Sequence, residues 1–170
     1  GAWQDSVPCL FISGQVKLSE ASRNSGVQGL RQFGVQELDI IPVVSSLTKY
    51  VSRLDDPQKV RFELEKSVAM AKQGRPGPVW MEIPMDVQNV LVDPKKLVGF
   101  KHKYTVPIPS VSSVERVVTL LHKAKRPVII AGRGIRIANA CQSLLRLSRS
   151  QKIPVVTPYL GVDNIRHDDE

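Results

Sequence analysis

Apolar runs separated by polar segments set the pattern of the first part of the chain. Residues 7–16 (VPCLFISGQV) are apolar without strict alternation, which predicts a buried parallel strand. The polar residues 17–29 predict a loop. Residues 39–47 are rich in β-branched side chains, although Pro42 argues against a central strand. Residues 48–51 predict a short strand or a strand end.

The clearest helix follows Asp55 and Asp56, either of which can cap it, with Pro57 in its first turn. Three- and four-residue spacing predicts one apolar face, formed by Val60, Leu64, Val68 and Ala71. Gly74 stands where a helix usually ends. After a tight Pro–Gly connection, residues 78–83 (PVWMEI) predict the next strand.

Prolines, serines and lysines dominate residues 93–112, a composition typical of an interdomain linker. Ser112 or Ser113 is then expected to cap a second helix, whose apolar face would be Val114, Val117, Val118, Leu121 and Ala124.

The rest of the chain repeats the alternation of strand and helix. Residues 128–132 (VIIAG) predict a buried strand that ends in a glycine turn, residues 137–150 a helix, and residues 153–157 a further strand. This order favours an α/β fold with open parallel sheets and flanking helices. We expect parts of two Rossmann-like domains, residues 1–92 and 113–170.

Composition narrows the class of protein. Hydrophobic residues make up 42% of the 170 positions, but no run approaches the roughly 20 residues of a membrane helix. The start of the chain lacks the basic and apolar regions of a signal peptide, and also lacks Met, so we expect a piece of a longer protein. Cys9 and Cys141 are expected to be buried, reduced thiols. A cytoplasmic protein without a membrane partner fits these features.

A net charge of +8 raises the question of a nucleic-acid partner. The basic clusters lie at residues 95–96, 101–103 and 123–126, but aromatic residues are only 5% of the chain and no nucleic-acid motif is present. Solvated faces, or a basic surface for an acidic partner chain, explain the clusters better than nucleic acid.

Three segments are candidates for chemistry. Residues 131–136 (AGRGIR) lie between a strand and a helix, where backbone N–H groups can meet a phosphate, although the motif alone favours a plain turn. Residues 31–40 (RQFGVQELDI) form either a loop anchored by hydrogen bonds or a loop that presents an amide to a ligand. Glu82 and Asp86 are four residues apart with Pro84 between them, which argues against a catalytic pair.

Several segments together resemble one family. WQDSVPCLFISGQV, RQFGVQELDI, TKYV, GRPGPVWMEIPMDVQ, RPVIIAGRGI and IPVVTPYLG occur in the order and spacing of thiamine diphosphate-dependent enzymes of the acetolactate synthase type. The resemblance implies that residues 1–92 are the later part of the pyrimidine-binding domain. It also implies that residues 113–170 begin the middle domain. The family's activating glutamate and its magnesium- and diphosphate-binding element would lie outside this chain, which alone would be inactive.

The resemblance also implies site residues. Gln36 matches the glutamine of the family's Phe-Gln-Glu loop near the cofactor, Val35 replaces its phenylalanine, and Met85 replaces a lysine near the active-site entrance. Where the middle domain binds FAD, the contacts would be Gly132, Arg133, Gly134, Thr157, Pro158 and Tyr159. No residue of the chain is expected to bind a metal.

The implied reaction decarboxylates a 2-oxo acid such as pyruvate and transfers the acyl-anion equivalent to a second carbonyl acceptor. Met85 and Val35 favour an acceptor other than pyruvate, for example in surface-sugar or other specialised metabolism. A homodimer or homotetramer is implied, since the family's active sites form between subunits. Two alternatives stay open: a non-catalytic nucleotide-binding, FAD-binding or regulatory module, and a basic interaction domain.

Overall fold

A computed structural model describes residues 1–101, 104–166 and 168 of the chain. It divides into two compact units, residues 1–106 and residues 107–170, which we describe separately. The first unit is built on a sheet of three parallel strands in the order β1-β3-β2. The strands are β1 (Leu10–Gln15), β2 (Tyr50–Arg53) and β3 (Val79–Pro84). Three of the predicted strands and their parallel direction are therefore confirmed.

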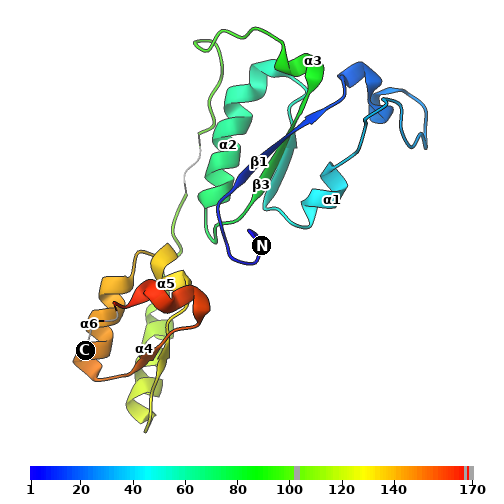
Figure 1. Cartoon of the computed structure of the whole chain (residues 1–170). Coiled ribbons are helices and arrows are strands. Elements are labelled where there is room, and N and C mark those ends of the chain that lie inside the picture. Colours follow the sequence, from blue (N-terminus) through cyan, green and yellow to red (C-terminus); the bar gives the residue numbers. More distant parts are fainter. Residues whose placement is uncertain (102–103, 167, 169–170) are drawn as a thin grey trace. The chain divides into compact units, whose positions relative to one another are not determined.

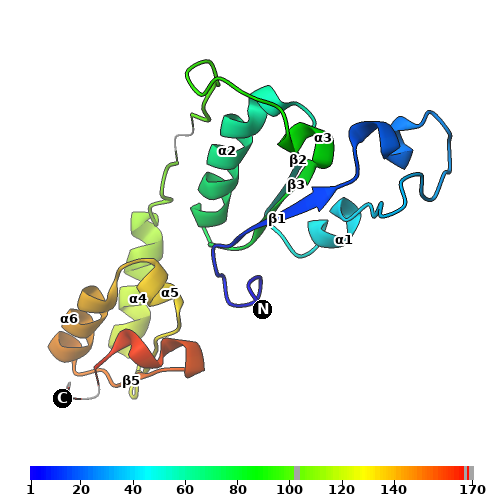
Figure 2. The ribbon, with the colours of Figure 1, turned by 45° about the horizontal axis from the view of Figure 1, so that its top comes forward.

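Helices cover the two faces of this sheet. The connection from β1 to β2 carries α1 (Ile41–Ser45), and the connection from β2 back to β3 carries α2 (Val60–Lys72). Right-handed crossovers that run in opposite directions along a sheet place their helices on opposite faces. Figures 1 and 2 show this arrangement, with α2 on one side of the strands and α1 on the other. A last short helix, α3 (Met85–Gln88), follows β3.

The α2 helix has the predicted limits but a rotated apolar face. The carboxylate of Asp56, not that of Asp55, caps the preceding turn η3 (Pro57–Lys59) by accepting from the N–H of Gln58 at 3.0 Å. Ser67 and Ala71 are the buried helix positions, whereas the side chain of Val68 is exposed. Adjacent helix residues differ by about 100°, so the contact with the sheet at Ser67 turns Val68 toward solvent.

One prediction for this unit was wrong, and one ambiguous segment is now assigned. Residues 7–16 were expected to be buried, yet Phe11 and Ile12 are exposed, because β1 is an edge strand that the helices cover only partly. The β-branched residues 39–47, where Pro42 argued against a central strand, contain the helix α1. Pro42 stands in the first turn of that helix, where its fixed φ and missing N–H cost nothing. The predicted loop 17–29 contains two single turns, η1 (Leu18–Glu20) and η2 (Ser22–Asn24).

The first part of the predicted linker packs on α2. The N–H of Phe100 donates to the Glu65 carboxylate at 2.6 Å, and its ring meets that of Phe62 edge-on at 5.4 Å. His102 and Lys103 lie outside the described residues. The next helix, α4 (Val111–Lys123), begins earlier than predicted, because Ser110 supplies the cap by accepting from the N–H of Ser113 at 3.2 Å.

The second unit contains one parallel strand pair, β4 (Ile129–Ile130) and β5 (Val155–Val156). Both strands are shorter than predicted. The expected helix 137–150 is two helices, α5 (Gly134–Ile137) and α6 (Cys141–Gln151). Asn139, with φ +53°, ends the first of them, because a left-handed residue cannot continue a right-handed helix. The turn η4 (Tyr159–Asn164) follows β5.

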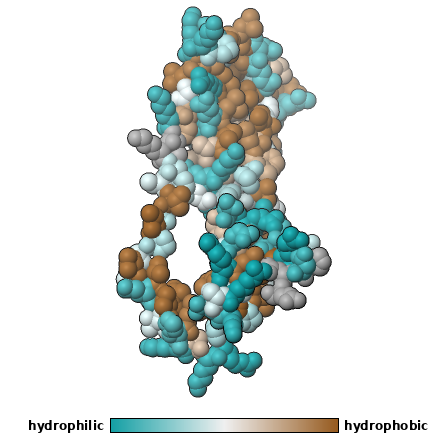
Figure 3. Space-filling model, turned by 90° about the vertical axis from the view of Figure 1, so that its left-hand side faces the viewer, coloured by the Kyte–Doolittle hydropathy of each residue, from teal (hydrophilic) through white to brown (hydrophobic). Residues whose placement is uncertain are grey.

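Apolar side chains reach the surface of both units (Figure 3). In the second unit they include Val114, Val117 and Val118, the predicted apolar face of α4, which is exposed. Cys9 and Cys141 are free but half-buried, not buried as expected. Within the described ranges, no helix combines the length and the apolar character needed to cross a membrane.

Candidate functional site

A cleft of about 480 Å³ opens at the carboxyl ends of the strands of the first unit. Its walls come from β1, from the loop after β1, and from β3 with α3. The lining residues are Ser13, Gly14, Gln15, Val16, Gln36, Leu38, Ile40, Trp80, Glu82, Met85 and Gln88.

The position of this cleft follows from the winding of the chain. After β1 the chain leaves toward the face that carries α1, and after β3 it continues toward residues that pack on α2. Neighbouring parallel strands whose connections leave on opposite faces open a crevice at their carboxyl ends, and ligands of open α/β sheets bind there. The cleft between β1 and β3 is such a crevice.

One wall of the cleft is aromatic. Phe11 and Trp80 are directly opposite in the register of β1 and β3, and their rings stack with centroids 5.5 Å apart. The indole N–H of Trp80 donates to the hydroxyl oxygen of Ser13 at 2.9 Å. Stacking and hydrogen bonding therefore fix the indole plane beside the cleft.

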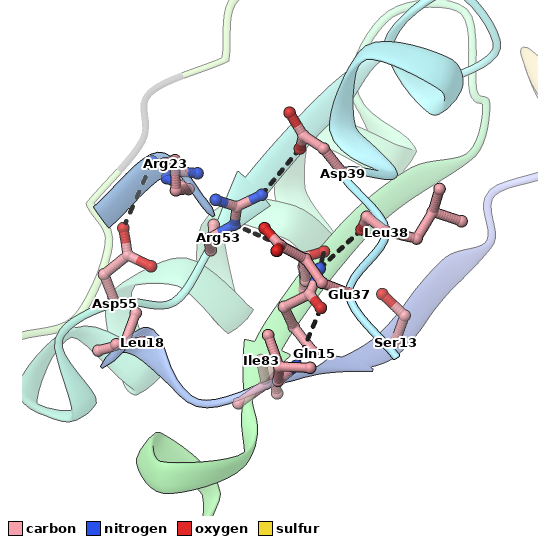
Figure 4. Close-up of polar contacts among 12 residues, drawn as sticks. Ser13, Gln15, Leu18, Arg23, Glu37, Leu38, Asp39, Arg53, Asp55 and Ile83 are labelled. Atoms are coloured by element: carbon pink, nitrogen blue, oxygen red, sulfur yellow. Dashed lines mark hydrogen bonds and ion pairs between the residues drawn. The ribbon is translucent and has the colours of Figure 1, made fainter. Parts of the chain in front are cut away.

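A buried polar network forms the floor. Glu82 has 0% exposure and forms an ion pair with Arg53 of β2, while the amide of Gln15 donates to it at 2.9 Å. Figure 4 shows how Arg53 and Gln15 also hold the neighbouring loop. The guanidinium contacts the Asp39 carboxylate at 3.0 Å, and the amide donates to the Leu38 carbonyl at 2.7 Å. Each of the three strands thus contributes one member of the network.

The charge of Glu82 depends on these partners. Burial raises the pKa of the Glu82 carboxyl, the hydrogen bond from Gln15 lowers it, and the nearby charge of Asp39 raises it, so that the net direction is upward. A buried carboxylate is costly unless it is paired and hydrogen-bonded. The ion pair with Arg53 and the amide of Gln15 supply both kinds of stabilisation.

The loop of residues 31–40 folds around the side chain of Glu37. This carboxylate accepts from the N–H and hydroxyl of Ser22, both at 2.6 Å, and from the backbone N–H of Phe33 at 2.7 Å. Burial raises the pKa of Glu37, but the hydrogen bonds from Ser22, Phe33 and Gly34 outweigh that effect and lower it. The interpretation of a loop anchored by hydrogen bonds is confirmed, and the anchored loop holds Gln36 at the cleft.

The structure brings some of the predicted site residues together. Gln36 and Met85, far apart in sequence, line the same cleft. Val35 does not line it and is 94% exposed, so a role for it in an acceptor pocket stays a prediction. Asp86 accepts from the N–H of Leu18 at 3.1 Å and takes no part in the floor network. Glu82 and Asp86 thus have separate structural partners, as Pro84 suggested.

Sequence reasoning missed Gln15 and Arg53. Gln15 is the next-to-last residue of the apolar run 7–16, and Arg53 lies two residues after the predicted strand end at Val51. Polar residues at the carboxyl ends of parallel strands are candidates for a site at the sheet edge, and this signal was available. What the sequence did not reveal is the strand order, which places Arg53 and Gln15 on either side of Glu82.

The second unit brings its two predicted flavin-contacting segments to one edge. Residues 132–134 follow β4 and residues 157–159 follow β5, the parallel neighbour of β4. The amide of Asn164 donates to the carbonyls of Ala131 at 3.0 Å and Gly132 at 2.9 Å, which fixes η4 against the glycine turn. However, α5 is a single turn and offers no extended helix N-terminus for a phosphate.

Among the described residues there is no group of three or more His, Cys, Asp or Glu side chains able to hold a metal ion. This finding concerns only the part of the chain that the structure describes.

Residues 114–170 match the family described as the central domain of thiamine pyrophosphate enzymes. The chain as a whole is similar to acetolactate synthases. It is 32% identical to a probable acetolactate synthase large subunit of Methanocaldococcus jannaschii, over 94% of this chain and 26% of that protein. The resemblance predicted from the motifs is therefore confirmed.

Two further relatives agree. The acetolactate synthase large subunit of Corynebacterium glutamicum is 35% identical over 93% of this chain and 24% of its own length. A chloroplastic acetolactate synthase of Arabidopsis thaliana is 32% identical over 98% of this chain and 24% of its own length. The chain spans about a quarter of the curated relatives it matches. Both units thus lie within the region that is similar to acetolactate synthases.

Proposed function

We propose that the protein containing this chain decarboxylates a 2-oxo acid and transfers the two-carbon or longer acyl group to a second carbonyl compound. The observation that carries this proposal is the cleft at the strand ends, which brings Gln36 and Met85 together in a chain similar to acetolactate synthases. Thiamine diphosphate supplies the stabilised carbanion that such chemistry needs.

The residues of the cleft fit that cofactor's organic end. The aromatic and aliphatic walls suit an uncharged ring, and the buried carboxylate of Glu82 on the floor suits a cationic one. The amide of Gln36 offers two donors and an acceptor at the cleft surface, so it can hold a carbonyl or hydroxyl oxygen of a substrate. The diphosphate and the magnesium ion would be bound by other parts of the protein.

The floor network has a positioning role in this proposal. Gln15 holds the backbone of Leu38 and Arg53 holds the side chain of Asp39, two and three positions after Gln36. Reacting groups gain rate when they are held in place, and a misplacement of about 1 Å can cost about 100-fold. We therefore assign Gln36 a substrate-contacting role and Gln15, Arg53 and Glu82 positioning roles.

Other parts of the earlier expectation remain proposals. An FAD bound by Gly132, Arg133, Gly134, Thr157, Pro158 and Tyr159 would use the edge where β4 and β5 end. The exposed Tyr159 ring and the open space beside Gly134 leave room for a flavin nucleotide. A cytoplasmic homodimer or homotetramer completes the proposal. Flavin absorbance of the purified intact protein tests the first point, and light scattering tests the second.

The activity is tested on the intact protein with thiamine diphosphate, Mg²⁺ and pyruvate or other 2-oxo acids. We expect release of carbon dioxide and a carboligation product identified by mass spectrometry. Gln36→Ala should reduce kcat at least tenfold, whereas Gln28→Ala, on the exposed loop, should leave it unchanged. Failure to decarboxylate any 2-oxo acid would refute the proposed function.

A further inference from the structure

The lining of the cleft is uncharged except for Glu82. Of the eleven lining residues, none is Lys, Arg or His, and the groups able to form hydrogen bonds at its surface are a serine hydroxyl and glutamine amides. At position 85, where a lysine would reach the cleft, the thioether of Met85 offers neither charge nor a hydrogen-bond donor. The described residues that line the cleft therefore offer no cationic side chain to pair with an anionic ligand.

The guanidinium of Arg53, which pairs with Glu82 at the floor of the cleft, is already neutralised. Arg53 contacts two carboxylates, those of Glu82 and Asp39, and its side chain is only 7% exposed. The trio carries a net negative charge when both acids are ionised. A carboxylate that entered the cleft would lose water without gaining a charged partner, which is costly.

Hydrogen-bonding capacity in the cleft remains unused. Gln36 lines the cleft, and within the described residues its side-chain amide has no hydrogen-bond partner, so its donors and its acceptor are free to bind a ligand. Gln88 uses one amide hydrogen on the carbonyl of Ile83 at 2.7 Å and keeps its oxygen. Ser13 accepts from Trp80 and keeps its own hydroxyl hydrogen. These groups match hydroxyl and carbonyl groups of a neutral ligand.

We infer that the acceptor bound in this cleft is an uncharged carbonyl compound that carries hydroxyl groups, and not a second 2-oxo acid. This inference rests on the proposed function. In the overall reaction, a 2-oxo acid loses carbon dioxide and its former carbonyl carbon bonds to the carbonyl carbon of the acceptor. The acceptor oxygen takes one proton from solvent, so that R–CO–COO⁻, R′–CHO and H⁺ give R–CO–CH(OH)–R′ and CO₂.

Product analysis separates the two levels of the proposal. The intact protein, loaded with thiamine diphosphate and Mg²⁺, receives pyruvate together with an equal concentration of glyceraldehyde. Carbon dioxide release reports the donor step, and mass spectrometry reports the acceptor. We expect the hydroxyketone formed from glyceraldehyde to exceed acetolactate at least tenfold. Carbon dioxide release with acetolactate as the main product would leave the proposed function standing and overturn the inference about the acceptor.

Binding gives a readout that does not require turnover. Trp80 lines the cleft, so its fluorescence should respond to ligands, and Trp80→Phe identifies its share of the signal. We expect glyceraldehyde to bind at least tenfold more tightly than glycerate, the carboxylate of matched size. Equal or tighter binding of glycerate would overturn the inference, whether or not carbon dioxide is released.

A charge introduced at the cleft provides the matched test. Met85→Lys should increase the ratio of pyruvate to glyceraldehyde used as acceptor by roughly three- to tenfold, because the new ammonium group pairs with a carboxylate. Leu91→Lys adds the same charge at a position that is 97% exposed and outside the cleft, and the ratio should not change. An unchanged ratio in Met85→Lys, or an equal increase in both variants, would contradict the assignment.

Discussion

The side-chain amide of Gln15, at the end of β1, donates a 2.9 Å hydrogen bond to the buried carboxylate of Glu82 on β3. The same amide also donates to the carbonyl of Leu38, so one nitrogen ties an edge strand, the central strand and the loop beside the cleft. The amide oxygen of Gln15 accepts from the N–H of Val16 at 2.9 Å. Both the nitrogen and the oxygen of the Gln15 amide therefore form hydrogen bonds, which fix its orientation.

Replacing Gln15 by leucine should destabilise the protein. Glu82 would lose a hydrogen bond in a buried position, and such a loss costs about 1–3 kcal/mol. The denaturation midpoint in urea should fall for Gln15→Leu and stay unchanged for Gln28→Leu, in which the replaced side chain is exposed. A midpoint for Gln15→Leu equal to that of the parent would show that the network contributes nothing to stability.

The free energy of unfolding should fall in acid, partly because Glu37 becomes protonated there. The pKa of Glu37 is lowered in the folded protein, so as the pH falls the unfolded chain takes up a proton at this residue before the folded protein does. The contribution of Glu37 to the free energy of unfolding is therefore complete above its unfolded pKa. This contribution is lost as pH falls below the usual value of 4.5 and through the folded pKa. Thermal melts of Glu37→Gln at pH 7 and at pH 4 should therefore differ less than those of the parent.

The Glu37 comparison has an internal control. Glu20 is an exposed carboxylate of the same region, with only a 3.7 Å ion pair to Lys17. Glu20→Gln should retain the parent's pH dependence. If Glu37→Gln and Glu20→Gln change the pH dependence equally, the hydrogen bonds from Ser22 and Phe33 are not its cause.

Gly161 should tolerate no side chain. A Cβ atom at this position would lie 2.3 Å from the carbonyl oxygen of Ala131, a backbone atom that cannot move aside without distorting β4. We expect Gly161→Ala to cost at least about 1–3 kcal/mol through overpacking. At Gly134 nothing lies within 4 Å of the added atom, so Gly134→Ala should be neutral or slightly stabilising. Differential scanning calorimetry of the two alanine variants measures this contrast.

Asp56 and Asp55 should differ although they are adjacent. Asp56 accepts from the N–H of Gln58 at the start of the α2 segment, and loss of such a cap costs about 1 kcal/mol. Asp55 makes only an exposed 3.9 Å ion pair with Arg23, which is worth little. In chemical denaturation, the free energy of unfolding of Asp56→Ala should be clearly lower than that of Asp55→Ala. If Asp55→Ala is instead the less stable variant, Asp56 is not the residue that caps the helix.

Local pattern was enough to predict much of this fold. The Asp–Pro start and Gly74 end of α2 were readable because capping and left-handed termination depend on adjacent residues. The residues 39–47 were harder, because their β-branched side chains suit a strand while Pro42 suits a first helical turn. Burial of β1 was overestimated, since a sequence does not reveal which strand lies at the edge of a sheet.

The site was predictable only in part, and for a physical reason. Gln36 and Met85 came from the resemblance to a family, and the structure places both at one cleft. The network of Gln15, Arg53 and Glu82 arises from pairing between strands that are distant in sequence. Because the order β1-β3-β2 places the last strand in the middle, no local pattern indicates that these three side chains meet.

The crossovers on opposite faces of the β1-β3-β2 sheet have an evolutionary consequence. They fix where the crevice opens through the backbone, independently of the side chains that project into it. Residues such as Met85 can then be exchanged without disturbing the winding of the chain. The same scaffold is therefore free to acquire new substrates through a few substitutions, with the buried ion pair of Arg53 and Glu82 preserving the architecture beneath them.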